Sequence, residues 1–226
     1  NTSIGRYFHL GYIPAPLTIY QNIYKLEQGS MLKFSFSDFK VKKWWDINDL
    51  KFSDQTISNE QQAIQELDYF LNDSVKLRIA NHNQVCSLLS GGIDSSLVSA
   101  IAARHVDEPI NTFYVKFDHD KDSESVWAQK ISKHIGSKHN VLNFNSKEAV
   151  EYIPKMILQY DEPYADSSAI PTMFVSKMVS KKFPFVLTGD GGDELFHGYG
   201  AHLWARRLNN IFIKSFKGII GQLLSL

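Results

Sequence analysis

The stretch "SLLSGGIDSS" at residues 87–96 decides the fold, because it joins a short apolar run to two glycines, a carboxylate and paired serines. Gly91 and Gly92 permit backbone angles that other residues avoid, and they let another group approach the main chain closely. The apolar residues that follow recur at helical spacing: Leu97, Val98, Ile101 and Ala102. The stretch therefore predicts a strand, a glycine turn and a helix N-terminus, whose N–H groups favour an anion such as phosphate.

Strand and helix patterns alternate around this stretch. Strands are predicted over 84–89, 112–117, 139–144 and 183–190, and helices over 95–104, 124–135, 147–160 and 168–181. This alternation predicts an α/β fold, a doubly wound parallel sheet with flanking helices on both faces. Ligands of such sheets bind beyond the carboxyl ends of the strands. The glycine turns at 90–96 and 188–193 both leave such ends, so we expect them to meet.

The first part of the chain has a different pattern. Residues 1–45 are rich in aromatic and β-branched residues, and residues 30–47 predict two antiparallel strands that turn near Ser37 and Asp38. A polar linker is expected over 46–58. Ser58 and Gln61 then have the spacing of a capping box at the start of a helix. The predicted apolar face of that helix comprises Ala63, Ile64, Leu67, Phe70, Leu71 and Val75.

Composition limits the class of protein. The 226 residues are 43% apolar and 21% charged, which is typical of a soluble globular protein, and the zero net charge argues against a nucleic-acid partner. The single cysteine, Cys86, excludes an internal disulfide and favours a reducing, cytoplasmic setting. The sequence holds no run of 18 apolar residues, so no membrane span is expected. The first residues lack a signal peptide, and an apolar helical pattern over 211–226 stops abruptly, so we interpret the chain as a fragment.

A second glycine turn, "LTGDGGDELFHGYG" at 187–200, carries Asp190, Asp193 and Glu194. As a solvated loop it would be unremarkable. Carboxylates this close repel one another unless a cation joins them, and Mg²⁺ with phosphate oxygens is a natural partner. Asp94 and Asp193, from adjacent strand ends, could then hold one Mg²⁺. For residues 90–96 the plainer interpretation is a helix start with Asp94 or Ser95 as the N-cap.

Two common nucleotide motifs are absent, since neither G-x-x-x-x-G-K-[ST] nor G-x-G-x-x-G after a strand occurs. A third polar stretch, "YDEPYADSSAIP" at 160–171, has two interpretations. Its carboxylates are explained by capping of the next helix, and they also suit an amine-bearing substrate. Both interpretations stay open from the sequence.

Together these stretches carry a family resemblance. "SGGIDSS", "DEPYADSSAIP" and "TGDGGDELFHGYG", in this order and spacing, resemble the synthetase domain of glutamine-dependent asparagine synthetases, and "LGYIPAPLTIYQNIYKLEQGSMLKF" at 10–34 resembles the end of that family's glutaminase domain. The resemblance implies an ATP-pyrophosphatase-type domain of the adenine-nucleotide alpha-hydrolase kind over 59–226. It also implies a β-rich glutaminase remnant over 1–45 and a linker between them.

The resemblance implies amide synthesis by carboxylate adenylation, with ATP, Mg²⁺, aspartate and glutamine-derived ammonia as the small molecules involved. A homodimer of the full-length protein is compatible with it. It gives Asp190 and Glu194 catalytic roles, and Asp94 and Asp193 the metal. The implied ATP and pyrophosphate site comprises Leu88, Ser90, Gly91, Gly92, Asp94, Ser95, Ser96, Val115, Thr188 and Gly189.

Some features differ from the family pattern. The glutaminase nucleophile, an N-terminal cysteine, does not occur in this chain, and the family's catalytic lysine would follow Leu226, so we expect the isolated chain to be inactive. His197 stands where the family usually has glycine, which leaves the acceptor carboxylate open. A related amidotransferase acting on a sugar acid or a peptide, and a non-catalytic nucleotide-binding domain, are the alternatives.

Overall fold

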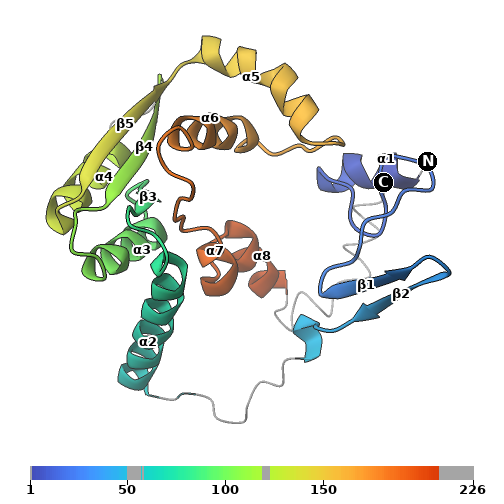
Figure 1. Cartoon of the computed structure of the whole chain (residues 1–226), viewed down its shortest axis with the longest axis horizontal. Helices are drawn as coiled ribbons and strands as arrows, with labels where there is room; N and C mark the ends of the chain where they lie inside the picture. The colour runs from blue at the N-terminus through green and yellow to red at the C-terminus, as the bar shows by residue number, and fades with distance from the viewer. Residues whose placement is uncertain (1, 50–56, 58, 119–122, 209–226) are drawn as a thin grey trace. The chain divides into compact units, whose positions relative to one another are not determined.

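The structure, a computed structural model, describes residues 2–49, 57, 59–118 and 123–208. The chain divides into two compact units. The first comprises residues 1–74, 115–120 and 141–184, and the second comprises 75–114, 121–140 and 185–226. Figure 1 labels the helices and strands of both units.

The first unit contains the predicted hairpin. Strands β1 (Ser30–Ser35) and β2 (Asp38–Lys43) pair antiparallel, with Ser35 opposite Asp38, so the turn prediction is confirmed within one residue. A 3₁₀ turn, η1 (Ile47–Asp49), follows. Helix α1 (Thr2–Leu10) was missed, because a β-rich region was predicted there. Its signal was the i, i+3, i+4 spacing of Ile4, Tyr7 and Phe8.

Helix α2 (Glu60–Ile79) occupies the predicted position, but its cap and its apolar face differ. Ser58 lies outside the described residues. Asn59 instead accepts a hydrogen bond from the Gln61 N–H at 2.9 Å. Ile64 is 59% exposed and Phe70 62% exposed, so among the described residues the predicted apolar face is only partly covered. The helical period was right, but the other described residues cover only the last turns, where Val75 and Ile79 are buried.

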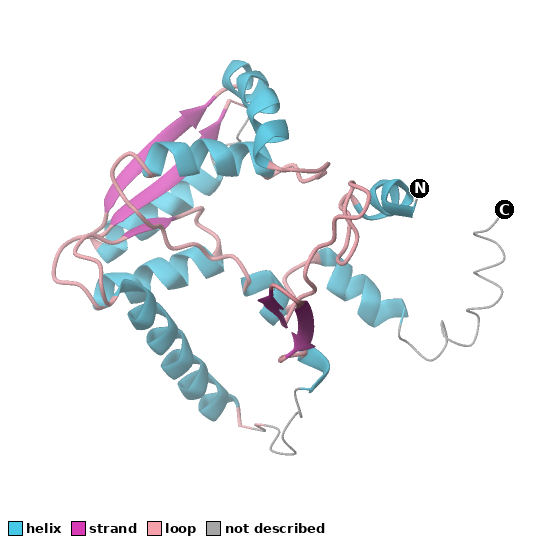
Figure 2. Cartoon of the chain, turned by 45° about the vertical axis from the view of Figure 1, so that its right-hand side comes forward, coloured by secondary structure: helices cyan, strands magenta, loops and turns pink. Residues whose placement is uncertain are grey.

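Three strands between residues 86 and 144 form a second sheet, drawn in magenta at the upper left of Figure 2. Its order is β3 (Cys86–Leu88), β4 (Asn111–Phe117) and β5 (Lys138–Phe144), and β3 and β4 are parallel. Helix α3 (Ile93–Arg104) joins β3 to β4. Helix α4 (Ser123–Ile135) leads into β5 after Gly136, whose φ is +69°. These strands and helices confirm the predicted alternation.

Each unit packs helices against its own part of β4. In the second unit, Tyr114 of β4 packs with Leu89 and Ala128 of α4. In the first unit, Val115 packs against a cluster formed by Phe144, helix α5 (Ser146–Gln159) and helix α6 (Ala169–Val179).

The segment 183–190 forms less strand than predicted. Its only pairing within the described residues is one parallel bridge between Ser87 and Leu187, with hydrogen bonds of 2.8 and 2.9 Å. Pro184 has no N–H to donate to a ladder, which explains the short pairing. Helices α7 (Gly192–Phe196) and α8 (Gly200–Leu208) follow. The helix predicted over 211–226 lies outside the described residues.

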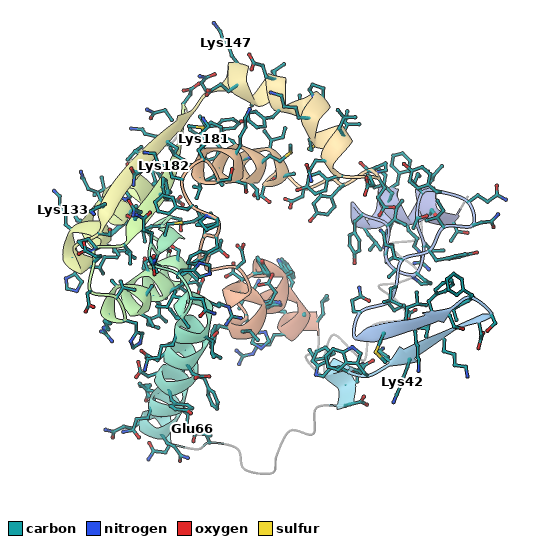
Figure 3. The ribbon with its side chains drawn as sticks, viewed as in Figure 1. Lys42, Glu66, Lys133, Lys147, Lys181 and Lys182 are labelled. Carbon is teal, nitrogen blue, oxygen red and sulfur yellow. The ribbon has the colours of Figure 1, made fainter. Side chains whose placement is uncertain are left out.

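Charged side chains such as Lys42, Lys133 and Lys147 point away from the ribbon (Figure 3). Over the part of the chain that the structure describes, no helix has the length and apolar content needed to cross a bilayer.

Candidate functional site

The loop after β3 has a conformation that requires glycine at one position. Gly91 has a φ of +88°, in the left-handed region. A Cβ atom at Gly91 would lie 2.8 Å from the Ala128 amide nitrogen and 2.9 Å from the Trp127 Cβ, both in α4. Gly92 has an ordinary φ of −70° and an extended conformation. Of the two glycines, it is Gly91 that both turns the chain and lets α4 approach it.

Helix α3 begins without a side-chain cap. Gly92 occupies the N-cap position, and no side chain accepts a hydrogen bond from the first turn. The prediction of Asp94 or Ser95 as the N-cap is therefore wrong. The hydroxyls bond elsewhere: Ser96 Oγ donates to the Gly92 carbonyl at 2.5 Å, and Ser90 Oγ and Ser95 Oγ lie 3.0 Å apart. The Gly92 N–H donates to Ser90 Oγ at 3.2 Å, and the N–H groups of the first turn have no side-chain cap among the described residues, an arrangement that favours an anion.

Two buried serines link the strand before this loop to the helix after it. Ser87 Oγ in β3 and Ser99 Oγ in α3 are 2.7 Å apart, and both residues are fully buried. Ser99 Oγ also donates to the Ser95 carbonyl at 2.7 Å. Buried hydroxyls cost free energy unless they are bonded, so this pairing fixes the position of α3 relative to β3. Sequence analysis missed Ser87 and Ser99, because a serine in an apolar run gives no sign of its partner.

The two glycine turns converge, as predicted. A Cβ atom at Gly189 would lie 2.7 Å from the Ser95 amide nitrogen, and one at Gly192 would lie 2.5 Å from the Asp94 carboxyl carbon. The backbone of the second turn therefore rests directly on the first turn of α3. Side chains at these two positions would push the turns apart.

A cavity of about 300 Å³ lies at this junction. It is lined by Leu88, Ser90, Gly92, Asp94, Ser95, Thr188, Gly189 and Asp190. Seven of these were predicted to bind ATP or pyrophosphate, and Asp190 was predicted to be catalytic. Gly91 packs under α4 instead, and the Val115 side chain packs in the Phe144 cluster. Ser96, Asp193 and Glu194 lie beside the cavity in sequence and are not among its lining residues.

The carboxylates of the second turn have different surroundings. Asp193 is half-buried, and a Cβ at Gly198 would meet its Oδ1, so its carboxylate faces Gly198. Asp190 and Glu194 are exposed. The Tyr199 hydroxyl donates to Glu194 Oε1 at 2.7 Å. This hydrogen bond lowers the pKa of the Glu194 carboxyl and raises the pKa of Tyr199 to about 12.

The residues after this turn contain a feature that the sequence did not reveal. His197 has a left-handed conformation with a φ of +59°, and its ring lies edge-on to the ring of His202, with centroids 5.0 Å apart. Tyr199, 5.6 Å from His202 by ring centroids, completes the group. The left-handed turn at His197 brings α8 back towards Glu194, so Tyr199 can reach it.

Within the described ranges, no group of three or more histidine, cysteine, aspartate or glutamate side chains could hold a metal ion. Asp94 and Asp193 are oxygen donors of the kind that Mg²⁺ takes, since Mg²⁺ is often bound by one or two carboxylates together with substrate phosphates.

The third polar stretch forms a turn before α6 without a side-chain cap. Asp166 accepts hydrogen bonds from the Ser168 N–H and hydroxyl, each at 2.8 Å, and these bonds lower its pKa. Ser168 is the N-cap residue of α6 and its side chain makes no capping hydrogen bond, so the capping interpretation is wrong in its details, although Asp166 does order the residues before the helix. Cys86 is fully buried, and burial raises the pKa of its thiol to about 12, so the thiol stays protonated and inaccessible to reagents.

The fold and this cavity define an α/β protein with a polar site at the carboxyl ends of its parallel strands. Residues 66–219 match the family model described as asparagine synthase. The chain belongs to the asparagine synthase family.

Curated relatives have the same family name. The chain is 35% identical over 226 residues to "Putative asparagine synthetase [glutamine-hydrolyzing] 2" of Methanocaldococcus jannaschii, covering 98% of this chain and 43% of the relative. It is 29% identical over 201 residues to "Asparagine synthetase [glutamine-hydrolyzing] 1" of Bacillus subtilis, covering 88% of this chain and 31% of the relative. The chain thus spans less than half the length of these relatives. Among solved structures, the NH3-dependent NAD synthetase of Campylobacter jejuni is similar with a TM-score of 0.42, 19% identity and 60% of each chain covered.

Proposed function

We propose that this chain is the nucleotide-binding part of a glutamine-dependent synthetase that converts aspartate to asparagine. The observation that carries the proposal is the contact of the two glycine turns, which places Asp94 against Gly189 and Gly192 beside an uncapped helix start. Membership of the asparagine synthase family supports ATP-dependent amide synthesis. The proposed fold is of the adenine-nucleotide alpha-hydrolase type.

The proposed organisation follows the sequence. Residues 1–45 form the end of a glutaminase domain, 46–58 a linker, and 59–226 the synthetase domain. The match to the Methanocaldococcus relative runs through 98% of the chain, so both proposed domains align with one longer protein. In the proposed full-length form of this protein, residues outside the present chain would supply the glutaminase nucleophile and a lysine for the adenylating step. The full-length protein could act as a dimer.

In the proposed reaction the acceptor carboxylate attacks the α-phosphate of ATP, pyrophosphate leaves, and ammonia then displaces AMP. Pyrophosphate carries a large negative charge, and preorganised donors lower the barrier by stabilising that charge as it develops. The N–H groups of the first turn of α3 would supply these donors, with the hydroxyls of Ser90 and Ser95 beside them, while the Gly92 N–H donates to Ser90 Oγ at 3.2 Å. Thr188, Gly189 and Leu88 would contact the adenosine.

The acidic residues would have separate roles. Asp94 and Asp193 would hold Mg²⁺, which offsets phosphate charge when bound. Asp190, exposed at the cavity rim, would lie near the reacting carboxyl group of the acceptor. Glu194 stays ionised because the Tyr199 hydrogen bond lowers its pKa, and it would orient an amine.

Pyrophosphate release by the full-length protein tests the proposal. Asp94→Asn and Asp190→Asn should each reduce ATP-dependent pyrophosphate release by a factor on the order of 10², the cost of losing one preorganised transition-state contact. Glutamine hydrolysis should survive in both variants. Asp73→Asn, which changes an exposed carboxylate of α2, is the matched control. Wild-type release by Asp94→Asn would show that the metal-ligand role is wrong.

The acceptor carboxylate that the protein uses decides between asparagine synthesis and the reactions of related amidotransferases. Aspartate, a sugar acid and a peptide carboxylate would be compared as acceptors in the same assay. Release with aspartate alone supports asparagine synthesis, and release with another carboxylate identifies a related amidotransferase. Binding of a fluorescent ATP analogue without pyrophosphate release from any acceptor would indicate a non-catalytic nucleotide-binding domain.

A further inference from the structure

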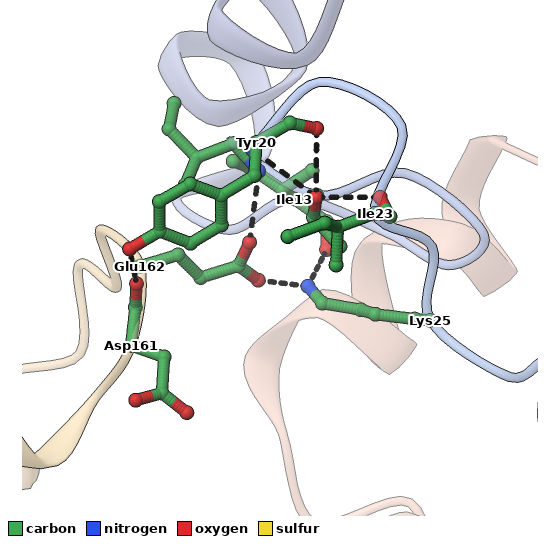
Figure 4. A network of polar contacts seen from close by, with 8 residues as sticks. Ile13, Tyr20, Ile23, Lys25, Asp161 and Glu162 are labelled. Atoms are coloured by element: carbon green, nitrogen blue, oxygen red, sulfur yellow. Dashed lines mark hydrogen bonds and ion pairs between the residues drawn. The ribbon is translucent and has the colours of Figure 1, made fainter.

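Residues 11–25, here called the strap, are bonded to residues 160–166, here called the acidic loop, across more than a hundred residues of sequence. The Ala165 N–H donates to the Gly11 carbonyl at 2.8 Å, and the Ile19 N–H donates to Glu162 Oε2 at 3.2 Å. The Tyr20 hydroxyl donates to the Asp161 carbonyl at 2.9 Å. Figure 4 shows the Tyr20 and Lys25 side chains beside Asp161 and Glu162.

Lys25 is at the centre of this contact (Figure 4). Its Nζ forms an ion pair with Glu162 Oε1 and donates to the Ile13 carbonyl at 2.6 Å. The Glu162 side chain is only 18% exposed, so its charge requires a partner. Both carboxylate oxygens of Glu162 are bonded by the strap, one by Lys25 and one by Ile19.

The strap is also braced internally. Thr18 Oγ1 donates within the strap to the Ile23 carbonyl at 2.7 Å, and the Lys25 N–H donates to the Pro16 carbonyl at 3.0 Å. A braced strap holds the Lys25 ammonium in place, so less rotamer freedom is lost when it pairs. The contact is therefore a built junction rather than a chance surface ion pair.

The strap and the acidic loop lie on different sides of residue 66, where the match to the asparagine synthase family begins. The strap precedes this residue, and the acidic loop lies inside the matched range. A cavity of about 710 Å³ is lined by residues of both. The junction thus joins the segment before the family domain to a loop within it.

We propose that Lys25 is a positioning residue, a latch that couples the part of the protein preceding the family domain to the acidic loop. Lys25 does no chemistry. In the full-length protein it holds the two parts together while ammonia from glutamine is used for amide synthesis, an inference that rests on the proposed function. Ammonia supplied from solution does not need this transfer, so loss of the latch should affect the two nitrogen sources unequally.

Amide hydrogen exchange of the full-length protein tests the contact without reference to activity. Lys25→Met should speed exchange of the Ile19 and Ala165 amides by about tenfold. Without the ion pair, the free energy needed to open the contact between the strap and the acidic loop is lower. The Leu88 amide, bonded to the Leu187 carbonyl at 2.8 Å, should not change. Lys43→Met is the matched control, because Lys43 pairs with Asp46 close to it in sequence. Unchanged exchange at Ile19 and Ala165 would overturn the latch.

AMP formation with each nitrogen source tests the coupling. The ratio of glutamine-supported to ammonia-supported AMP formation should fall about fivefold or more in Lys25→Met, the lower end of couplings between protein sites. Lys25→Arg, which keeps the ion pair, should restore most of the ratio, and Lys43→Met should leave it unchanged. If Lys25→Met folds poorly, Glu162→Gln removes the same charge pair with little change of shape.

The outcomes separate the latch from the proposed function. An unchanged ratio in Lys25→Met and Glu162→Gln, with normal wild-type activity, would overturn the coupling and leave the proposed function standing. A wild-type protein that forms no AMP with either nitrogen source would overturn the proposed function and the coupling together. Hydrogen exchange would still decide whether Lys25 holds the acidic loop.

Discussion

Replacing Gly189 with alanine adds one methyl group at the point where the two glycine turns touch. The added Cβ would lie 2.7 Å from the Ser95 amide nitrogen, 3.0 Å from the Asp94 Cβ and 3.1 Å from the Asp94 carbonyl carbon. Two of these atoms are backbone, so no side-chain rotation relieves the contact. Gly189 is not among the residues with positive φ, so alanine can adopt its backbone conformation and close approach alone causes the effect.

The magnitude follows from the geometry. Ordinary contact begins at 3.4 Å, so the second turn would have to move by about 0.7 Å from the Ser95 amide nitrogen. Overpacking of this kind typically costs about 1–3 kcal/mol. A functional group must be held within about 0.5 Å of its productive position, and a misplacement of about 1 Å can cost about 10²-fold in rate. We therefore expect lower stability and a loss of pyrophosphate release of about tenfold or more.

Urea unfolding and pyrophosphate release in the full-length protein measure both effects. Gly200→Ala is the matched control, because it adds the same methyl group at the start of α8 with nothing within 4 Å. If Gly189→Ala were as stable and as active as Gly200→Ala, the two turns would not be in contact, and the cavity between them would not be a binding site.

Three further predictions concern other residues. Ser99→Ala should lower the free energy of unfolding by about 1–3 kcal/mol, because it removes the 2.7 Å partner of the buried Ser87 hydroxyl and leaves it only the Leu88 carbonyl at 3.2 Å. The Ser87→Ala, Ser99→Ala double variant should lose less than the sum of the single variants in urea unfolding. Tyr199→Phe should be less stable than wild type at pH 7. The difference should close as the pH falls through the folded-state pKa of Glu194, which lies below its usual 4.5, because a carboxyl with a lowered pKa adds stability only while it is ionised. Cys86 should resist iodoacetamide at pH 8 in the native protein and react in urea, which mass spectrometry would show, because its thiol is buried and its pKa is about 12.

The strand, turn and helix around Gly91 could be predicted because their signals are local. Apolar spacing and a pair of glycines depend on a few neighbouring residues, and the structure follows the predicted bounds of α3 and α4 within one or two positions. Convergence of the two turns could also be predicted, since parallel strands place their carboxyl ends at one edge. The family resemblance, which depended on three motifs in order, was confirmed by the match over residues 66–219.

Long-range partners could not be predicted in the same way. The Asp94 or Ser95 cap was a local rule that failed, because Gly92 begins the helix and Asp94 packs against Gly192 instead. The face of α2 was predicted from periodicity alone, which cannot say whether another element covers it. Lys25 and Glu162 are 137 positions apart, and no sequence pattern pairs one lysine with one glutamate at that distance.

The carboxylates of the three motifs differ in whether a cation or a hydrogen-bond donor of the chain contacts them, a difference that the sequence does not show. Glu162 and Asp166 have their charges balanced within the chain, by Lys25 and by the Ser168 donors. Asp94 is half-buried as well, yet among the described residues none donates a hydrogen bond to its carboxylate, which rests against the backbone of Gly192. A partly desolvated carboxylate without a donor gains more from an added cation than one already paired. Asp193 is half-buried in the same way, and among the described residues none donates a hydrogen bond to its carboxylate either. Among the carboxylates of the three motifs, Asp94 and Asp193 therefore have the strongest physical reason to take the metal roles proposed for them, and Asp94 lies beside the uncapped start of α3, where an anion would also be stabilised.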